Sequence, residues 1–258
     1  MKKRVTRSIV PNLLTLANLL SGFTAIVHTS AGDLQTAALF ILIAAIFDML
    51  DGIMARLFKA TSEFGVELDS LCDVVSFGVA PAFMLYKAYF EHVGESGILM
   101  AALPALSGVV RLARFNVQIA SFDDKKYFKG MPIPASALTI ISYLIFIHDS
   151  AHVSAEFSQY LVYFVTISVS GAMISNISFD NIPRPTARQI KERPFAFGIF
   201  IIGLALSIIT KGFFIFPFMA FYIVASSIRY VYFWIKEKQE PEDEIDETED
   251  SEPHPYDL

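Results

Sequence analysis

The chain has 258 residues, of which 54% are hydrophobic, and its mean hydropathy is +0.50. This composition is more apolar than one soluble core requires, so it argues against a soluble globular protein and indicates an integral membrane protein. The net charge of −6 arises at the C-terminal end, because residues 237–258 hold eleven acidic residues and one Lys, whereas residues 1–236 carry 19 basic against 15 acidic residues.

Apolar segments predict an all-α fold, a polytopic helical bundle of about eight transmembrane helices with six to eight true crossings. One spanning helix needs about 20 apolar residues, and the fifth and seventh segments are short. The basic start of the chain resembles a secretory signal, but the many later apolar segments indicate a retained first span. In chain order the predicted spans are 9–28, 34–56, 66–90, 98–118, 133–148, 158–178, 195–210 and 213–235.

Charge in the connections predicts how the spans are oriented. Short cytoplasmic loops are rich in Lys and Arg, and with the N-terminus inside, all connections on that side are basic while the other side receives only Lys87 and Lys211. We therefore expect both termini in the cytoplasm and the protein in the cytoplasmic membrane. Residues 1–236 form the predicted membrane domain, and residues 237–258 are too acidic to fold and form a predicted disordered tail.

Four aspartates lie near the predicted cytoplasmic ends of the second and third spans. A charged side chain near a bilayer centre costs about 3 kcal/mol on the lenient scale, so this group requires a cation or a water-filled cavity. Asp48 and Asp51 are three residues apart and Asp69 and Asp73 four apart, which places each pair on one helical face. We expect the four carboxylates to converge and to bind hard divalent cations, Mg²⁺ or Mn²⁺, with two ions fitting better than one.

Small and cationic residues accompany these aspartates. Gly52 costs about 1 kcal/mol relative to Ala inside a helix, and the missing side chain would let a ligand approach the backbone. Ala55 keeps the same face small, Arg56 offers a planar fork suited to phosphate, and Gly65 opens the third span. A glycine alone more often reflects close packing between membrane helices, but the fixed relation to four aspartates favours a binding site.

These positions fit the pattern DxxDGxxARx8GxxxDxxxD, with eight fixed positions in a 26-residue window. The pattern resembles the signature of the CDP-alcohol phosphotransferase family, also called class-I CDP-alcohol phosphatidyltransferases. The resemblance implies a transferase of phospholipid biosynthesis that binds two divalent metals and a CDP-linked lipid, and it implies a homodimer. It implies metal binding by Asp48, Asp51, Asp69 and Asp73, a general-base role for Asp73, and CDP binding by Gly52, Ala55, Arg56 and Gly65.

Three further segments resemble the phosphatidylserine synthase branch of that family, in which the acceptor is L-serine and the donor is CDP-diacylglycerol. The first puts Asn12, Thr15 and Asn18 on one stripe of the first span, where contact with the nucleotide and hydrogen bonding between helices are equally plausible. Serine carries a carboxylate that needs a cationic partner. The predicted acceptor-binding residues at the end of span four and before span five are Arg111, Arg114, Asn116 and Lys129.

Two alternatives fit part of this pattern. Another family member such as a phosphatidylglycerophosphate synthase would keep the chemistry, but its phosphorylated acceptor calls for a denser basic pocket. A divalent-cation transporter would use the acidic cluster as a transit site, but transport predicts ionisable groups along a path through the membrane. Here the acidic residues stay in the predicted cytoplasmic half.

Overall fold

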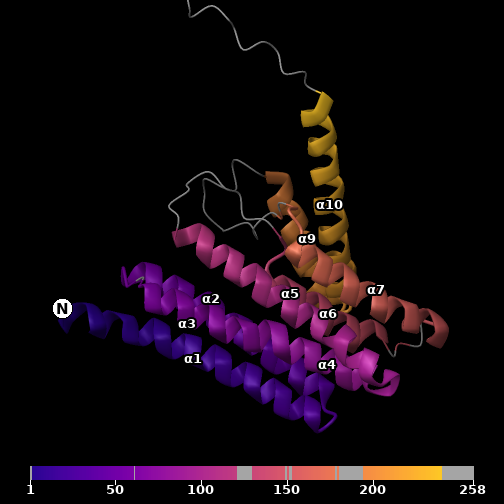
Figure 1. Cartoon of the computed structure of the whole chain (residues 1–258), viewed down its shortest axis with the longest axis horizontal. Coiled ribbons are helices and arrows are strands. Elements are labelled where there is room, and N and C mark those ends of the chain that lie inside the picture. Colours follow the sequence, from indigo (N-terminus) through magenta and orange to yellow (C-terminus); the bar gives the residue numbers. More distant parts are fainter. Residues whose placement is uncertain are drawn as a thin grey trace, which may run out of the picture.

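The computed structural model describes residues 2–60, 62–120, 130–148, 150, 153–177, 179 and 194–239. Every regular element in these ranges is helical, which confirms the predicted all-α class (Figure 1). The α-helices are α1 (Lys2–Ser30), α2 (Leu34–Leu57), α3 (Glu63–Asp73), α4 (Ala80–Ala88), α5 (Glu95–Ala120), α6 (Ile133–Tyr143), α7 (Ala155–Ile174), α9 (Pro194–Ile209) and α10 (Ile215–Gln239), with π-helices η1 (Val74–Val79) and η3 (Leu144–His148) and the 3-10 helix η2 (Phe90–Val93).

Six helices of the described part are long and apolar enough to cross a membrane, at the lower end of the predicted six to eight. Helices α3 and α4 count as one of them, because η1 joins them into the continuous helix Glu63–Ala88. The predicted fifth span corresponds to the shorter helix Ile133–His148, and the seventh corresponds to α9. All eight predicted segments are therefore helical, although two are too short to meet the length expected of a span.

The third span is the centre of the bundle. It has the largest buried share of the six candidate spans, 56%, compared with 11% for Ile215–Lys236 in α10. Segment η1 contacts α1, α5 and α6. Close approach is possible because Gly22 of α1 lies directly against Ser76, where an added Cβ would lie 2.6 Å from the Ser76 Cα.

Polar side chains cap the beginnings of α2 and α3. Asp33 precedes α2 and its Oδ1 accepts a hydrogen bond from the Thr36 backbone N at 3.0 Å. Ser62 precedes α3 and its Oγ accepts from the Gly65 backbone N at 3.1 Å. Such side chains satisfy backbone donors that have no partner within the helix.

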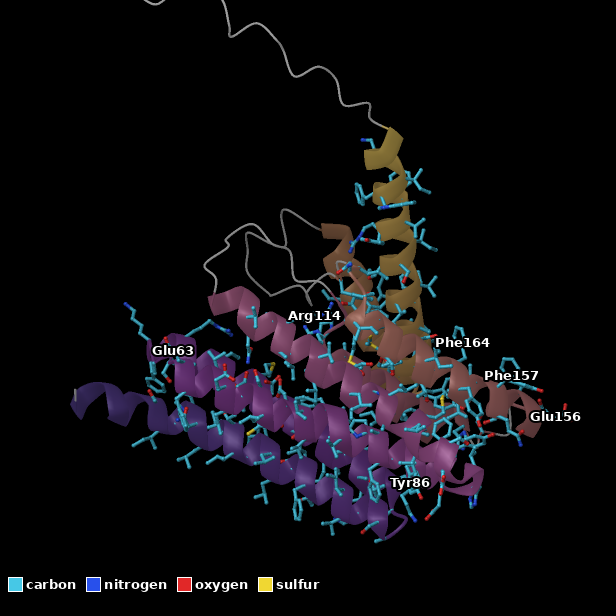
Figure 2. All side chains as sticks on the ribbon, viewed as in Figure 1. Glu63, Tyr86, Arg114, Glu156, Phe157 and Phe164 are labelled. Carbon is cyan, nitrogen blue, oxygen red and sulfur yellow. The ribbon has the colours of Figure 1, made fainter. Side chains whose placement is uncertain are left out.

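Antiparallel connections bring several helix ends to one end of the bundle (Figure 1). The first half of α1, the second half of α2, the beginning of α3 and the end of α5 lie there, and Glu63 marks this end in Figure 2. Helix α10 runs across the direction of α1 and α5 in this view and extends beyond them.

The C-terminal end of α7 is bound by the segment that leads into α6. The Gly130 N donates to Ile177 O at 2.8 Å, and the Met131 N donates to Ala172 O at 3.0 Å. Gly130 has φ +87° and packs against the Met173 carbonyl, a backbone conformation and an approach that favour glycine. These contacts fix the beginning of α6 beside the C-terminal end of α7.

Candidate metal and nucleotide site

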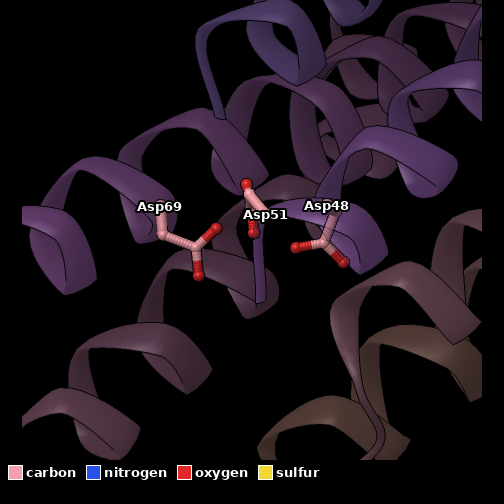
Figure 3. Close-up of side chains that lie close together, drawn as sticks. All are labelled: Asp48, Asp51 and Asp69. Atoms are coloured by element: carbon pink, nitrogen blue, oxygen red, sulfur yellow. The ribbon is translucent and has the colours of Figure 1, made fainter. Parts of the chain in front are cut away.

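Three of the four aspartates gather where α2 passes α3. Asp48, Asp51 and Asp69 each offer a carboxylate oxygen, and these atoms all lie within 4.8 Å of one another (Figure 3). The i, i+3 spacing puts Asp48 and Asp51 on one face of α2, and the short turn after Leu57 returns the chain so that Asp69 faces them. The sequence prediction that residues from both helices converge is consistent with this geometry.

The fourth aspartate, Asp73, lies beside that group and not within it. It is 7% exposed and is the last residue of α3, immediately before η1. It follows Asp69 by four residues, about one helical turn along the same face of α3.

Helix α1 holds two of these carboxylates through uncharged side chains. The Thr15 Oγ1 donates to Asp51 Oδ2 at 2.8 Å, and the Asn18 Nδ2 donates to Asp73 Oδ1 at 3.0 Å. All four of these side chains are buried. The carboxylates are therefore oriented by hydrogen bonds from a neighbouring helix, an arrangement that is common around metal ligands.

Like charges at this separation repel, and the repulsion is strong where water is scarce. The Asp69 Oδ1 is buried and has no hydrogen-bond partner within the described ranges. Oxygen ligands of this kind suit Mg²⁺, Mn²⁺ or Ca²⁺. The donor set thus fits a divalent cation, and a bound phosphate would complete the coordination of such an ion.

The predicted nucleotide-binding residues form two small contacts next to the cluster. An added Cβ at Gly52 would lie 3.6 Å from Arg56 Nη1, so the exposed Arg56 side chain turns back over the open face of α2. At the start of α3, an added Cβ at Gly65 would lie 3.7 Å from Asn12 Oδ1. Asn12 and Gly65 are therefore neighbours, and Ala55 of α2 is half-buried.

The predicted acceptor-binding residues of α5 differ in what they contact. Arg111 is half-buried, and its Nε is buried without a hydrogen-bond partner in the part of the chain that the structure describes. Arg114 lies on the side of α5 that faces the later helices (Figure 2) and its Nη2 donates to Met173 O at 3.2 Å. Since that carbonyl belongs to the C-terminal end of α7, Arg114 links α5 to α7 and satisfies a free helix carbonyl.

Asn116 connects α5 to α3. Its Nδ2 donates to Ser70 Oγ at 3.1 Å and to Glu67 Oε2 at 3.4 Å, so its described contacts are with α3 and not with either arginine. Lys129, the remaining predicted acceptor residue, lies outside the described residues.

Sequence reasoning did not select Thr15 and Asn18 as residues that hold the aspartates. Their spacing along α1, together with Asn12, was the available signal, since it places all three on one helical stripe. The contact partners could not be read from that stripe, because the rotation of α1 against α2 and α3 is a tertiary property.

Comparisons with known proteins find similarity to one family of enzymes. The family model described as CDP-alcohol phosphatidyltransferase matches residues 8–173. A CDP-diacylglycerol–serine O-phosphatidyltransferase of Helicobacter pylori is 30% identical over 226 residues, which cover 88% of this chain and 92% of that protein. An archaetidylserine synthase of Methanothermobacter thermautotrophicus is 37% identical over 185 residues, with 70% and 73% covered. The Bacillus subtilis CDP-diacylglycerol–serine O-phosphatidyltransferase is 30% identical over 183 residues, with 71% and 96% covered.

Proposed function

The chain belongs to the CDP-alcohol phosphatidyltransferase family, and on that premise we propose that it transfers the phosphatidyl group of CDP-diacylglycerol to the hydroxyl of L-serine. The products are phosphatidylserine and CMP. The observation that carries the proposal is the grouping of Asp48, Asp51 and Asp69 beside Asp73, in a chain whose similarity to serine phosphatidyltransferases extends over most of its length.

The reaction requires one bond to form and one to break at a single phosphorus. The serine oxygen attacks the phosphorus that bears diacylglycerol, and the bond from that phosphorus to the oxygen of CMP breaks. Asp73 takes the hydroxyl proton, and CMP leaves with the electron pair of the broken bond. A positioned base of this kind contributes about 10²- to 10⁴-fold to a rate, and the buried position of Asp73, one helical turn after Asp69, suits the role.

Divalent cations are the proposed cofactors, and we expect two ions of Mg²⁺ or Mn²⁺. Asp48, Asp51 and Asp69 would hold them, with Asp73 contributing at the edge. When bound, such ions neutralise charge on the diphosphate and on the transferred group. Gly52, Ala55, Arg56, Gly65 and Asn12 surround this position and are the proposed CDP-binding residues, with close backbone approach at the glycines.

Serine recognition is proposed to rest on Arg111. Its Nε is buried and has no hydrogen-bond partner among the described residues, and we propose that the substrate carboxylate satisfies it. Arg114 donates from one nitrogen to α7, and we propose that the rest of its planar fork binds the same carboxylate. Asn116 would shape the site through α3, and Lys129 is proposed to approach from the segment before α6.

The active site is proposed to face the cytoplasm, with both termini on that side, and the molecule to act as a homodimer in the cytoplasmic membrane. The distribution of Lys and Arg supports the orientation. The chain is similar both to a CDP-diacylglycerol–serine O-phosphatidyltransferase and to an archaetidylserine synthase. The donor lipid could therefore carry either acyl or isoprenoid chains. A labelling experiment with membrane-impermeant maleimide on single cysteines in the loops tests the orientation.

A CMP-release assay tests the function. Purified protein with CDP-diacylglycerol and Mn²⁺ should release CMP with L-serine and not with glycerol 3-phosphate, inositol phosphate or no acceptor. Asp73→Asn should lower kcat at least about 100-fold, whereas Asp33→Asn, at the opposite end of α2, should leave it unchanged at pH 7. Chelation with EDTA should abolish CMP release, and added Mn²⁺ should restore it.

Two results would overturn the proposal. Release of CMP with glycerol 3-phosphate but not with serine would identify a phosphatidylglycerophosphate synthase. Flux of Mn²⁺ into proteoliposomes without CMP release would identify a cation transporter.

A further inference from the structure

Asn18 is buried beside the proposed base, and among the described residues only one of the two polar atoms of its side chain has a hydrogen-bond partner. It is 0% exposed, and its Nδ2 donates to Asp73 Oδ1 at 3.0 Å. A carboxylate only accepts hydrogen bonds, so the amide NH₂ must face Asp73 and the amide oxygen must face elsewhere. That Oδ1 is buried and has no partner among the residues that the structure describes. Leaving a buried acceptor unsatisfied is unfavourable, which calls for a ligand that satisfies it.

The backbone of Asn18 is fixed to the same segment that carries Asp73. Ser76 Oγ donates to Asn18 O at 3.0 Å, and Ser76 lies one turn after Asp73. Gly22 packs directly on Ser76 at the next turn of α1, which leaves no room for α1 to shift toward η1. The amide oxygen of Asn18 is therefore held at a defined place next to the Asp73 carboxylate.

We propose that Asn18 is an acceptor-site residue that selects a vicinal amino alcohol, which rests on the function proposed above. Asp73 receives the hydroxyl proton, and Asn18 Oδ1 accepts a hydrogen bond from the ammonium group on the adjacent carbon. The Asp73 carboxylate and Asn18 Oδ1 lie close together, because the Nδ2 of the same planar amide donates to that carboxylate. The hydroxyl and the ammonium of serine also lie close together, because they are bonded to neighbouring carbons. Arg111 binds the carboxylate, so the three substituents of serine meet three different side chains.

The proposed preference for acceptors with an amine follows from the cost of leaving the buried Asn18 Oδ1 without a hydrogen bond. An acceptor without an amine leaves Asn18 Oδ1 unsatisfied, and sites that hydrogen-bond a substrate group reject analogues lacking it far better than apolar pockets reject extra bulk. Glycerol 3-phosphate and inositol phosphate have no ammonium group and would be disfavoured at this point, independently of the charge that Arg111 accommodates.

The test compares L-serine with 3-hydroxypropionate, which is serine without its amine, in the CMP-release assay on the full-length protein. For Asn18→Leu, which removes the oxygen but keeps similar bulk, we expect the kcat/KM ratio of serine to 3-hydroxypropionate to fall at least tenfold. Asn18→Asp keeps an oxygen at this place, so its ratio should stay within threefold of the unmodified chain even though its kcat falls. If 3-hydroxypropionate reacts too slowly for kcat/KM to be measured, its inhibition constant in the reaction with serine is compared instead.

Ser21→Ala is the matched control, because Ser21 is a buried polar residue of the same helix and, within the described part of the chain, its Oγ donates to its own helix at Ala17 O, 2.8 Å away. It should change neither the rates nor the ratio. The ammonium contact would be overturned if Asn18→Leu lowered kcat/KM equally for serine and 3-hydroxypropionate. It would also be overturned if Asn18→Asp lost the preference for serine. If Asn18→Leu does not fold, the result with Asn18→Asp decides alone. Failure of the proposed function shows separately, as an unmodified protein that releases no CMP with serine.

Discussion

Individual side chains of α1 decide how the aspartates are oriented. Thr15 and Asn18 are uncharged, and each donates to one carboxylate on a different helix, Asp51 on α2 and Asp73 on α3. A carboxylate held in this way does not have to give up rotational freedom when it binds a cation. The contribution of α1 to the site therefore lies in orientation and not in charge.

Thr15→Val tests this contribution, because valine has the same shape but cannot donate to Asp51. We expect Mn²⁺ affinity to fall about tenfold, the lower end of the effect of residues that support metal ligands. Electron paramagnetic resonance of free Mn²⁺ measures it. Thr29→Val is the control, since Thr29 is also buried in α1 and its hydroxyl, as far as the structure describes the chain, donates to Ala25 O of its own helix at 2.8 Å. Equal affinities for both variants would contradict the prediction.

Asp33, in the turn between α1 and α2, gives a pH-dependent contribution to stability. Hydrogen bonds from Thr36 lower the pKa of its carboxyl, with a smaller effect from His28. Because the folded pKa is below the unfolded value, the charge stabilises the fold above the unfolded pKa, and this contribution disappears as pH falls through the folded pKa. Asp33→Asn keeps the cap without charge, so its melting temperature should be slightly lower than that of the unmodified chain at pH 7 and equal to it near pH 2.

Among the elements, η1 has the largest consequence for the site. A π-helical turn of six residues, Val74–Val79, follows Asp73 directly, and such turns inside α-helices often occur at functional sites. It changes the rotation of α4 relative to α3 and places Ser76 against α1. The close contact between Gly22 and Ser76 is thus what holds α1 in register with the acidic residues.

Gly22→Ala should disturb that register. The new Cβ would lie 2.6 Å from the Ser76 Cα, and such overpacking costs about 1–3 kcal/mol. We expect a lower melting temperature and a loss of CMP release. Gly171→Ala in α7 is the control, because nothing lies within 4 Å of its added Cβ, and it should be neutral or slightly stabilising. A Gly22→Ala protein as active and stable as the control would show that α1 is free to move.

For the molecule as a whole, ligand binding and stability are linked through the acidic cluster. Without a cation, the carboxylates of α2 and α3 repel one another, and a ligand that binds only the folded state stabilises it by mass action. The third span is the most buried of the six, so changes at its aspartates reach the centre of the fold.

Mn²⁺ with CDP, each at about 100 times its dissociation constant, should raise the melting temperature in detergent by about 5–10 °C. Asp48→Asn should abolish most of this shift, because it removes a cluster carboxylate. Differential scanning fluorimetry measures both. A full shift in Asp48→Asn would exclude the cluster as the binding site.

The sequence alone determined the helical class and the positions of the segments, because apolar runs of sufficient length can satisfy their backbone in a membrane only as helices or closed barrels. It also determined which carboxylates lie together on each helix, since spacing of three or four residues is a local property. The short connection between α2 and α3 also predicted that the two aspartate pairs lie at the same end of the bundle.

Only the tertiary structure decided which residues hold those carboxylates and which arginine is engaged elsewhere. The contacts of Asn18 with Asp73 and of Arg114 with Met173 join residues 55 and 59 positions apart, and they depend on helix rotation and on the π-helical turn of η1. Helix rotation is set by packing between small residues such as Gly22 and Ser76, and no periodicity within one segment encodes the partner that the segment will meet.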